Sequence, residues 1–298
     1  MSKNALITGA TGFVGSNLTR HLLANGWNVA AVIRPSSDLS QLKDIKGIQT
    51  HTHDNTCENL IEIVKAAKPD CVFHLASCVL VNHLPAQIES LIQSNVLFGS
   101  HLAEAMAHNN VRNLVNTSTG WLHFNNEDYN PVNLYAATKK ALEDVLKFYS
   151  EAGFLDVITL KLNDTYGPND PRGKLIPTLC KQIESGEELA MSLGGQFIDL
   201  VHVQDVVKAF SLAAEMLRAP KEKGFNQTYA VSSQRSLSLR DLVRQLEEII
   251  GKDAPIEWGG RPYRDREVME PWQADKLLPG WIAEIPLKEG LEQIIAAS

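Results

Sequence analysis

The 298-residue sequence is poor in cysteine and in aromatic residues, and it has no excess of positive charge. Its four cysteines, Cys57, Cys71, Cys78 and Cys180, fall at no spacing typical of a metal site or a disulfide framework. We therefore expect reduced, structural thiols and no bound metal. The formal net charge of −7 argues against nucleic acid or an anionic membrane as the main partner. Because no apolar run could span a bilayer and the N-terminus does not resemble a cleavable signal, we expect a cytoplasmic globular protein.

The first two-thirds of the sequence alternates short apolar runs with longer amphipathic segments. The apolar runs predict strands at Asn4–Thr8, Trp27–Ile33, Cys71–Ala76, Leu114–Ser118 and Val157–Leu162. The amphipathic segments predict helices at Ser16–Asn25, Glu58–Lys68, Ile88–His108 and Ala136–Glu151. Strands separated by helices predict an α/β fold of the Rossmann type, in which a doubly wound parallel sheet carries helices on both faces.

The pattern changes after residue 168. A loop precedes a predicted helix near Ile176–Ser185 and a short strand near Leu189–Ser192, and Ile198–Leu217 then predicts another strand and helix of the main sheet. The tail from about residue 220 contains more Pro, Gly and Trp and one clear helix, Ser238–Ile250. We therefore predict a cofactor-binding Rossmann domain from residues 1–168 plus 198–219, and a smaller C-terminal substrate-binding lobe from residues 169–197 plus 220–298.

A glycine-rich segment, Thr8–Gly15, lies directly between the first predicted strand and the first helix. Glycine allows a tight turn and the close approach of a pyrophosphate, and the N–H groups at the start of the helix then face the phosphate charge. An ordinary glycine-rich turn is the alternative, but the strand–loop–helix order favours a dinucleotide site. The predicted cofactor-binding residues of this loop are Gly9, Thr11, Gly12, Phe13, Val14 and Gly15.

The residues after the second strand indicate which dinucleotide binds. An acidic residue at this position would accept hydrogen bonds from the ribose hydroxyls of NAD, but the sequence has Arg34, followed closely by Ser36 and Ser37. These side chains suit a 2′-phosphate, whereas the alternative is an arginine that is merely exposed at a strand end. We therefore predict NADP(H) as the cofactor.

Tyr135 and Lys139 are four residues apart on a predicted helix, so their side chains share one face. A free tyrosine has a pKa of about 10, and a neighbouring positive charge lowers the pKa of a phenol. Thr119 ends the preceding strand, where its hydroxyl could hold a substrate oxygen against Tyr135. Alone, this spacing would indicate a surface pair, but behind a phosphate loop it predicts a proton-transfer site. His74 and His202 lie inside apolar runs and are expected to be structural.

These motifs resemble the extended short-chain dehydrogenases/reductases that modify nucleotide sugars, a group of epimerases, 4,6-dehydratases and 4-keto-sugar reductases. The similarity includes Phe73–Ser77, where the family has His-Leu-Ala-Ala, and continues through Lys161–Pro168 and Asp199–Val206 into the C-terminal region. The last two segments are similar to those of CDP-abequose and CDP-paratose synthases. The resemblance implies that Tyr135 is the general acid/base, that Lys139 orients the ribose and lowers the pKa of Tyr135, and that Thr119 binds the sugar oxygen.

The resemblance also implies further binding residues. Those implied for the cofactor are Asp54 and Asn55 near the adenine, together with Leu75, Ala76, Ser77, Asn95, Tyr135 and Lys139. Those implied for the substrate are Thr119, Asp164, Lys174, Leu175, Arg261 and Arg264.

Three departures from the family pattern bear on the reaction. Gly120-Trp121 follows Thr119, where the dehydratases have Asp-Glu, so dehydration is disfavoured. Ile198 stands where many relatives have an arginine that grips the substrate pyrophosphate, which leaves that role to Arg261, Arg264 or Arg266. Asp164 replaces a common Asn, and its carboxylate could hydrogen-bond a sugar hydroxyl.

Three functions remain open on the sequence. The first is NADPH-dependent reduction, at C4, of a CDP-, dTDP- or other NDP-linked 4-keto-6-deoxyhexose in deoxysugar biosynthesis, with Tyr135 as the proton donor. The second is a nucleotide-sugar 4-epimerase, and the third is a non-catalytic NADP-binding sensor, which would not need the Tyr–Lys pair. Arg34 favours net reduction, because exchangeable NADPH suits it. The resemblance also implies a homodimer, formed through Ile88–His108 and Ala136–Glu151.

Overall fold

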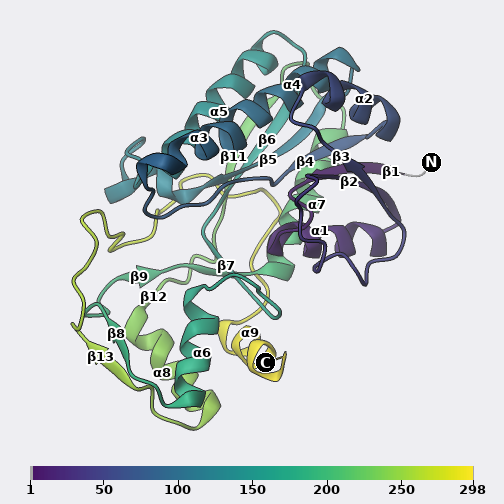
Figure 1. Ribbon diagram of the computed structural model, residues 1–298. Helices are drawn as coiled ribbons and strands as arrows, with labels where there is room; N and C mark the ends of the chain where they lie inside the picture. The colour runs from purple at the N-terminus through teal and green to yellow at the C-terminus, as the bar shows by residue number, and fades with distance from the viewer. Residues whose placement is uncertain (1–2, 298) are drawn as a thin grey trace. The chain divides into compact units, whose positions relative to one another are not determined.

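A seven-stranded parallel sheet lies at the centre of the first of two units in the computed structural model, which describes residues 3–297 (Figure 1). In spatial order its strands are β3 (Ile48–Thr52), β2 (Trp27–Ile33), β1 (Lys3–Thr8), β4 (Cys71–His74), β5 (Asn113–Thr119), β6 (Asp156–Leu162) and β11 (Asn226–Val231). Every residue of β4 is buried, which explains why this strand is an uninterrupted apolar run that ends in a histidine.

Helices cover both faces of this sheet, as predicted for a doubly wound fold. They are α1 (Phe13–Ala24), α2 (Cys57–Ala67), the short η1 (Pro85–Gln87), α3 (Ile88–Ile92), the π-helical η2 (Gln93–Leu97), α4 (Phe98–His108), α5 (Leu134–Glu151) and α7 (Val203–Arg218). Helices α2, α4 and α5 lie on one face, with α1 and α7 on the other (Figure 1). Leu60, Leu102 and Leu142, one from each helix of the first group, are fully buried in the core beneath that face.

The strand order reverses between β1 and β4, which are neighbours in the sheet although α1, β2, β3 and α2 separate them along the chain. The loops that follow these two strands therefore meet at the carboxyl edge of the sheet. The Leu75 amide donates to the carbonyl of Thr8 over 3.1 Å, and the Ala76 amide donates to the Thr8 hydroxyl over 3.3 Å. Ligands of doubly wound sheets bind at such a reversal point.

The second unit has its own core and only short sheets. Its elements are η3 (Gly120–Leu122), η4 (Phe124–Asn126), β7 (Asp164–Tyr166), α6 (Leu175–Ser185), β8 (Leu189–Met191), β9 (Phe197–Ile198), β10 (Leu200–His202), β12 (Leu237–Ser238), α8 (Leu239–Ile250), β13 (Ile256–Trp258) and α9 (Leu287–Ala297). The strands pair as β7 with β10, β8 with β13 and β9 with β12. Leu179, Leu242 and Leu291, from α6, α8 and α9, are fully buried in its core.

The two units divide the chain differently from the sequence prediction. The first comprises Met1–Thr119, Asn133–Lys161 and Val207–Ala230, and the second comprises Gly120–Val132, Leu162–Val206 and Val231–Ser298. Residues 120–132, 162–168 and 198–206 thus belong with the second unit, whereas 220–230 belong with the first. Strand β11, which the sequence analysis did not predict, explains the last difference, because it completes the main sheet.

The prediction that Ile198–Leu217 adds a strand to the main sheet is wrong. Its strand, β10, pairs with β7 in a separate two-stranded sheet, and only the predicted helix, α7, belongs to the fold of the first unit. The buried Asp199 explains why this segment stays with the second unit. Its carboxylate accepts hydrogen bonds from the Ser233 amide over 3.0 Å and from the Asn163 side chain over 2.5 Å.

The four cysteines are free thiols, and Cys71 and Cys180 are buried. Over residues 3–297, no helix has the length and apolar character needed to cross a membrane, and no group of three or more potential ligands could hold a metal ion.

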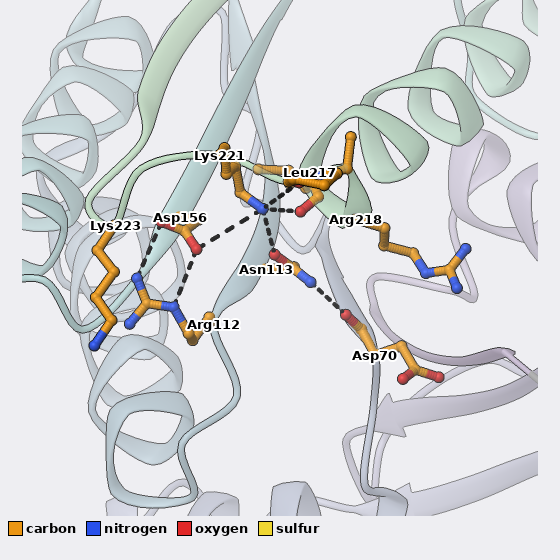
Figure 2. Close-up of a pocket in the computed structure, with 10 residues that line it drawn as sticks. Asp70, Arg112, Asn113, Asp156, Leu217, Arg218, Lys221 and Lys223 are labelled. Atoms are coloured by element: carbon orange, nitrogen blue, oxygen red, sulfur yellow. Dashed lines mark hydrogen bonds and ion pairs between the residues drawn. The ribbon is translucent and has the colours of Figure 1, made fainter.

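At the amino edge of the main sheet, the buried carboxylate of Asp156, at the start of β6, connects the segments that precede β5 and β11. Asp156 forms two hydrogen bonds of 3.1 Å with the Arg112 guanidinium and also accepts from the Gly224 and Phe225 amides, which precede β11. Figure 2 shows this cluster lining a pocket, with the ammonium of Lys221 near the same carboxylate. Three of the charged side chains that line this pocket, Asp156, Arg112 and Lys221, are therefore paired with one another.

Replacing Asp156 with Asn is expected to lower the free energy of unfolding by about 3 kcal/mol, because Arg112 would lose its counter-charge in a largely buried setting. The loss should appear as a lower midpoint in urea denaturation. The exposed pair between Lys65 and Glu62 provides the control, and Glu62→Gln should leave the midpoint unchanged. Equal midpoints for Asp156→Asn and the unmodified protein would contradict this structural role.

Candidate active site

The glycines of the predicted phosphate loop differ in whether the surrounding protein leaves room for a side chain. Gly9 has φ +74°, and a Cβ there would lie 2.6 Å from the Ala76 nitrogen. A Cβ on Gly15 would lie 2.1 Å from the Gly9 carbonyl oxygen. A Cβ on Gly12 would meet only the Gly9 oxygen, at 3.4 Å. The protein's own packing therefore requires glycine at Gly9 and Gly15, whereas Gly12 leaves open space next to the helix start.

Helix α1 begins with its amino end suited to a phosphate. Gly12 is its N-cap; among the described residues no side chain caps it, and its first turn carries no acidic residue. Thr11 and Val14 are half-buried, whereas the side chain of Phe13 is buried in the core. Of the loop residues predicted to bind the cofactor, Phe13 could therefore do so only through its backbone.

Arg34 lies immediately after β2 on the surface. Its backbone forms a turn with Ser37, in which the Arg34 amide donates to the Ser37 hydroxyl over 2.9 Å. Within the described part of the chain, the Arg34 guanidinium forms no hydrogen bond or ion pair, and Ser36 beside it is exposed. This positive charge is available to an anionic ligand.

Asp54 and Asn55, predicted near the adenine, follow β3 and precede α2. The Asp54 carboxylate accepts from the amide and the hydroxyl of Thr56, at 2.9 and 2.7 Å, and these hydrogen bonds lower the pKa of Asp54. Asn55 adopts φ +73° in the same turn. Both side chains are exposed, and the Asp54 carboxylate also helps to start the helix.

Lys139, on α5, is 1% exposed and has no hydrogen-bond partner for its Nζ atom. Burial lowers the pKa of Lys139 to about 8, and the charge of Glu143 opposes this effect. An unsatisfied buried ammonium is costly in a folded protein, and it fits a ligand that brings hydroxyl acceptors. The ribose of a nicotinamide cofactor would supply such groups, as the resemblance implies.

The Tyr135 phenol lies one turn before Lys139 on α5, where it is hydrogen-bonded to the side chains of Ser77 and Thr119. Ser77 comes from the loop after β4 and Thr119 from the end of β5, so two neighbouring strands hold the phenol. Thr119 is itself buried. The predicted grouping of Thr119 and Tyr135 is therefore present, and Ser77 is a contact that sequence reasoning did not assign.

The prediction that Lys139 lowers the pKa of Tyr135 is wrong for the protein without ligands. Burial raises the pKa of Tyr135 to about 12, and its hydrogen bonds with Ser77 and Thr119 offset only part of this effect. The sequence pattern showed that the two side chains share a helix face, but it could not show how deeply the phenol is buried. At neutral pH, Tyr135 therefore holds its proton.

Asn95 ties the β4 loop to α5. Its side-chain oxygen accepts from the Cys78 amide over 2.7 Å and from the Ser77 hydroxyl over 3.1 Å. Its amide nitrogen donates to the Thr138 hydroxyl over 2.9 Å. Asn95 lies in η2, the π-helical turn that interrupts the predicted helix Ile88–His108, and such turns often occur at functional positions. Asn95 thus positions Ser77, and through it Tyr135.

Of the predicted substrate residues, Thr119 ends β5 in the first unit, and the others lie in the second unit. Asp164 is exposed at the start of β7, and the charges of Lys174 and Arg264 act on its carboxylate. Lys174 is the N-cap of α6, and Leu175 is the first residue of that helix. Arg264 forms hydrogen bonds of 2.8 and 2.7 Å with the Glu267 carboxylate, so its guanidinium is already paired.

Arg261 and Arg266 differ in whether the guanidinium already has a hydrogen-bond partner. Arg266 hydrogen-bonds Asn130 and lies 4.2 Å over the Phe124 ring. The exposed Arg261 guanidinium forms no hydrogen bond within residues 3–297. Of the three arginines proposed to replace the pyrophosphate grip, Arg261 is thus the one whose guanidinium forms no hydrogen bond with the described residues.

His74 has the structural role expected of it, because its Nδ1 atom lies 2.8 Å from the Thr8 hydroxyl. Burial lowers the pKa of His74 to about 3, with a smaller contribution from Lys139, so the ring is neutral. His202 packs edge-on against Tyr166 at 5.3 Å between ring centres, inside the second unit.

A glycine-lined loop at the reversal point of a doubly wound sheet, followed by a buried Tyr–Lys pair, defines an extended short-chain dehydrogenase/reductase. The chain belongs to the NAD dependent epimerase/dehydratase family, whose family model matches residues 5–229.

Known proteins are similar over almost the whole chain. CDP-abequose synthase from Salmonella muenchen is 26% identical over 304 residues, which cover 99% of this chain and 98% of the relative. UDP-glucose 4-epimerase from Mycolicibacterium smegmatis is 29% identical, over 97% of this chain and 96% of its own. Among solved structures, MoeE5 in complex with UDP-glucuronic acid and NAD superposes with a TM-score of 0.86 at 26% identity, covering 99% and 98% of the two chains.

The difference between Gly12 and Gly15 can be tested directly. Gly12→Ala should fold with a nearly unchanged melting temperature, because Gly12 has φ −83° and a Cβ there is tolerated by the protein. The same variant should bind NAD(P)H at least tenfold more weakly in a fluorescence titration, since the methyl group would stand where the pyrophosphate approaches. Gly15→Ala should instead melt several degrees lower. Normal cofactor binding by Gly12→Ala would show that the loop does not hold the dinucleotide.

Proposed function

We propose that the protein reduces the C4 keto group of a nucleotide-activated 4-keto-6-deoxyhexose, with NADPH as the reductant. The observation that carries this proposal is the protonated, buried Tyr135 phenol held by Ser77 and Thr119. Reduction of a ketone needs a proton donor at the oxygen that becomes an alkoxide. The residue pair is intact, so a sensor that only binds the dinucleotide is the weaker alternative.

In this mechanism the first unit binds NADP(H) and the second unit binds the sugar nucleotide. Gly12 and the start of α1 would hold the pyrophosphate, Arg34 the 2′-phosphate and Lys139 the ribose hydroxyls. The bound nicotinamide would supply hydride to the C4 carbon. Asn95 and the loop residues Leu75 and Ala76 border the same edge of the sheet.

Proton movement rests on Tyr135 and Thr119. Reduction at C4 would leave the electron pair of the C=O π bond on the oxygen. The Tyr135 phenol would transfer its proton there, and its phenolate would regain a proton from solvent. Thr119 would orient the oxygen toward the phenol.

The substrate class is inferred from the relatives and from free charges in the second unit. CDP-abequose synthase and UDP-glucose 4-epimerase are named for nucleotide sugars. The unpaired Arg261 guanidinium and the Lys174 side chain at the start of α6 would bind the diphosphate, whereas Asp164 would accept a sugar hydroxyl.

Association of two copies is part of the proposal. The helices expected at the interface expose Ile88, Ile92, Leu97 and Phe148 by more than 40% each, which is unusual for such large apolar side chains. A homodimer through α3–α4 and α5 would cover them.

A 4-epimerase is the second candidate, favoured by the 29% identity to a UDP-glucose 4-epimerase. An epimerase oxidises and re-reduces one carbon on a retained cofactor, so no cofactor is consumed overall. Reduction is preferred here because Arg34 is free and suits NADPH, which exchanges between turnovers.

When the protein is mixed with NADPH and a CDP- or dTDP-linked 4-keto-6-deoxyhexose, one molecule of NADPH should be oxidised for each molecule of substrate. The loss of absorbance at 340 nm measures this oxidation. Tyr135→Phe removes only the hydroxyl, so turnover should fall by about a hundredfold or more while NADPH binding persists. Thr119→Val should cost less, because the acid remains. Conversion of a 4-hydroxy sugar nucleotide to its C4 epimer without added reductant would replace this proposal with the epimerase.

Cofactor choice can be tested at Arg34. Arg34→Asp should weaken NADPH binding at least tenfold and improve the use of NADH, because attraction to the 2′-phosphate becomes repulsion. Binding constants for both cofactors, measured by fluorescence, would show the exchange. Replacement of Arg20, on the neighbouring α1, provides the control, because the guanidinium of Arg20 already donates a hydrogen bond to the Gln41 carbonyl. Equal affinity of the unmodified protein for NADPH and NADH would contradict the proposal that Arg34 selects NADP(H).

A further inference from the structure

Helix α5 carries a third polar side chain in line with Tyr135 and Lys139. Glu143 follows Lys139 by four residues, so the three side chains stand one turn apart on the same face. Neither the cofactor contacts nor the proton transfer described above uses Glu143. A half-buried carboxylate on the catalytic face of the helix therefore needs an explanation.

Ser118 holds the Glu143 carboxylate from the neighbouring strand. The Ser118 hydroxyl, which is 2% exposed, donates a hydrogen bond to Oε1 of Glu143. Ser118 directly precedes Thr119 on β5. These two adjacent hydroxyls at the end of β5 thus contact two side chains of α5, Glu143 and Tyr135.

The charges near Lys139 leave Glu143 as its counter-charge. His74, from β4, is neutral because burial lowers its pKa to about 3, and the buried Tyr135 is also uncharged. Glu143 is the charged group that favours the ammonium of Lys139. Lys161, from β6, and Lys140, on α5, are the other cations in this region, and the Glu143 charge also acts on Lys161.

The carboxylate acts on Lys139 without binding it. The Lys139 Nζ atom has no hydrogen-bond partner in the described chain, whereas Glu143 Oε1 is taken by Ser118. A direct ion pair would stabilise the ammonium more strongly, but it would also occupy the N–H groups that a ribose needs. Ser118 therefore keeps the negative charge close while leaving the donors of Lys139 free.

We propose that Glu143, held by Ser118, is a positioning residue that keeps the buried Lys139 ammonium charged and its donors free for the cofactor. This inference rests on the proposed function only for the identity of the ligand that Lys139 meets. The charge state of Lys139 is a property of the free protein, so it can be measured before any cofactor or substrate is added.

The experiment follows the ε-methylene signal of Lys139 by ¹H–¹³C NMR in protein labelled with ¹³C-lysine, from pH 6 to pH 10. The signal is assigned by its absence from Lys139→Met. The unmodified protein should titrate with a midpoint near the lowered pKa of about 8. Glu143→Gln keeps an oxygen acceptor for Ser118 but removes the charge, so its midpoint should fall by about one pH unit.

Two variants separate charge from structure. Asp144→Asn removes the neighbouring exposed carboxylate, which pairs with Lys140, and should leave the Lys139 midpoint in place. Ser118→Ala frees Glu143 to approach the ammonium, so the midpoint should stay level or rise while NADPH affinity falls several-fold. An unchanged midpoint in Glu143→Gln, or the same fall in Ser118→Ala and Glu143→Gln, would overturn the proposal.

Measurements of NADPH binding distinguish a failure of this inference from a failure of the proposed function. NADPH titrations at pH 8 should show several-fold weaker binding for Glu143→Gln than for Asp144→Asn, because less of Lys139 is charged. If the unmodified protein binds no nicotinamide cofactor, the proposed function fails even when the NMR midpoints shift as expected. If it binds normally and the midpoints do not shift, the role of Glu143 fails alone.

Discussion

Keeping an ammonium charged inside a protein is costly, and the first unit does so at Lys139 without a direct partner. The surrounding residues reflect that cost. His74 is held neutral beside it, Glu143 supplies a nearby negative charge, and Tyr135 remains a neutral phenol. The hydroxyls of a bound ribose would replace the water that Lys139 lost on folding, so cofactor binding would also stabilise the folded protein at this position.

The carboxyl edge of the sheet imposes the second constraint. Gly9 and Gly15 are held by contacts with the protein's own backbone, which brings the loop after β1 against the loop after β4. That contact sets the position of Ser77, and Ser77 contacts Tyr135. The glycine-rich loop and the Tyr135 phenol are therefore connected through the loop that follows β4.

Much of this arrangement follows from local sequence pattern. The buried strand β4 is a continuous apolar run, and the spacing of Tyr135 and Lys139 places them on one face of α5. Strand β3 was not predicted because Ile48–Thr52 is a half-exposed edge strand with little apolar character. The hydrogen bonds of Tyr135 with Ser77, and of Ser118 with Glu143, join residues far apart in the chain, so no periodicity could reveal them.

A proton donor at Tyr135 would serve a reductase and an epimerase equally. Tyr135 is positioned by β4 and β5 through Ser77 and Thr119, and an acid in this position serves any reaction at a sugar carbonyl. The difference must come from how the sugar is presented and whether the cofactor leaves after each turnover. In the proposed function, Arg261 would help to present the sugar and Arg34 would bind a cofactor that exchanges. The residues that would select the reaction thus differ from the residue that would transfer the proton, and relatives with 4-epimerase and synthase names can share one fold.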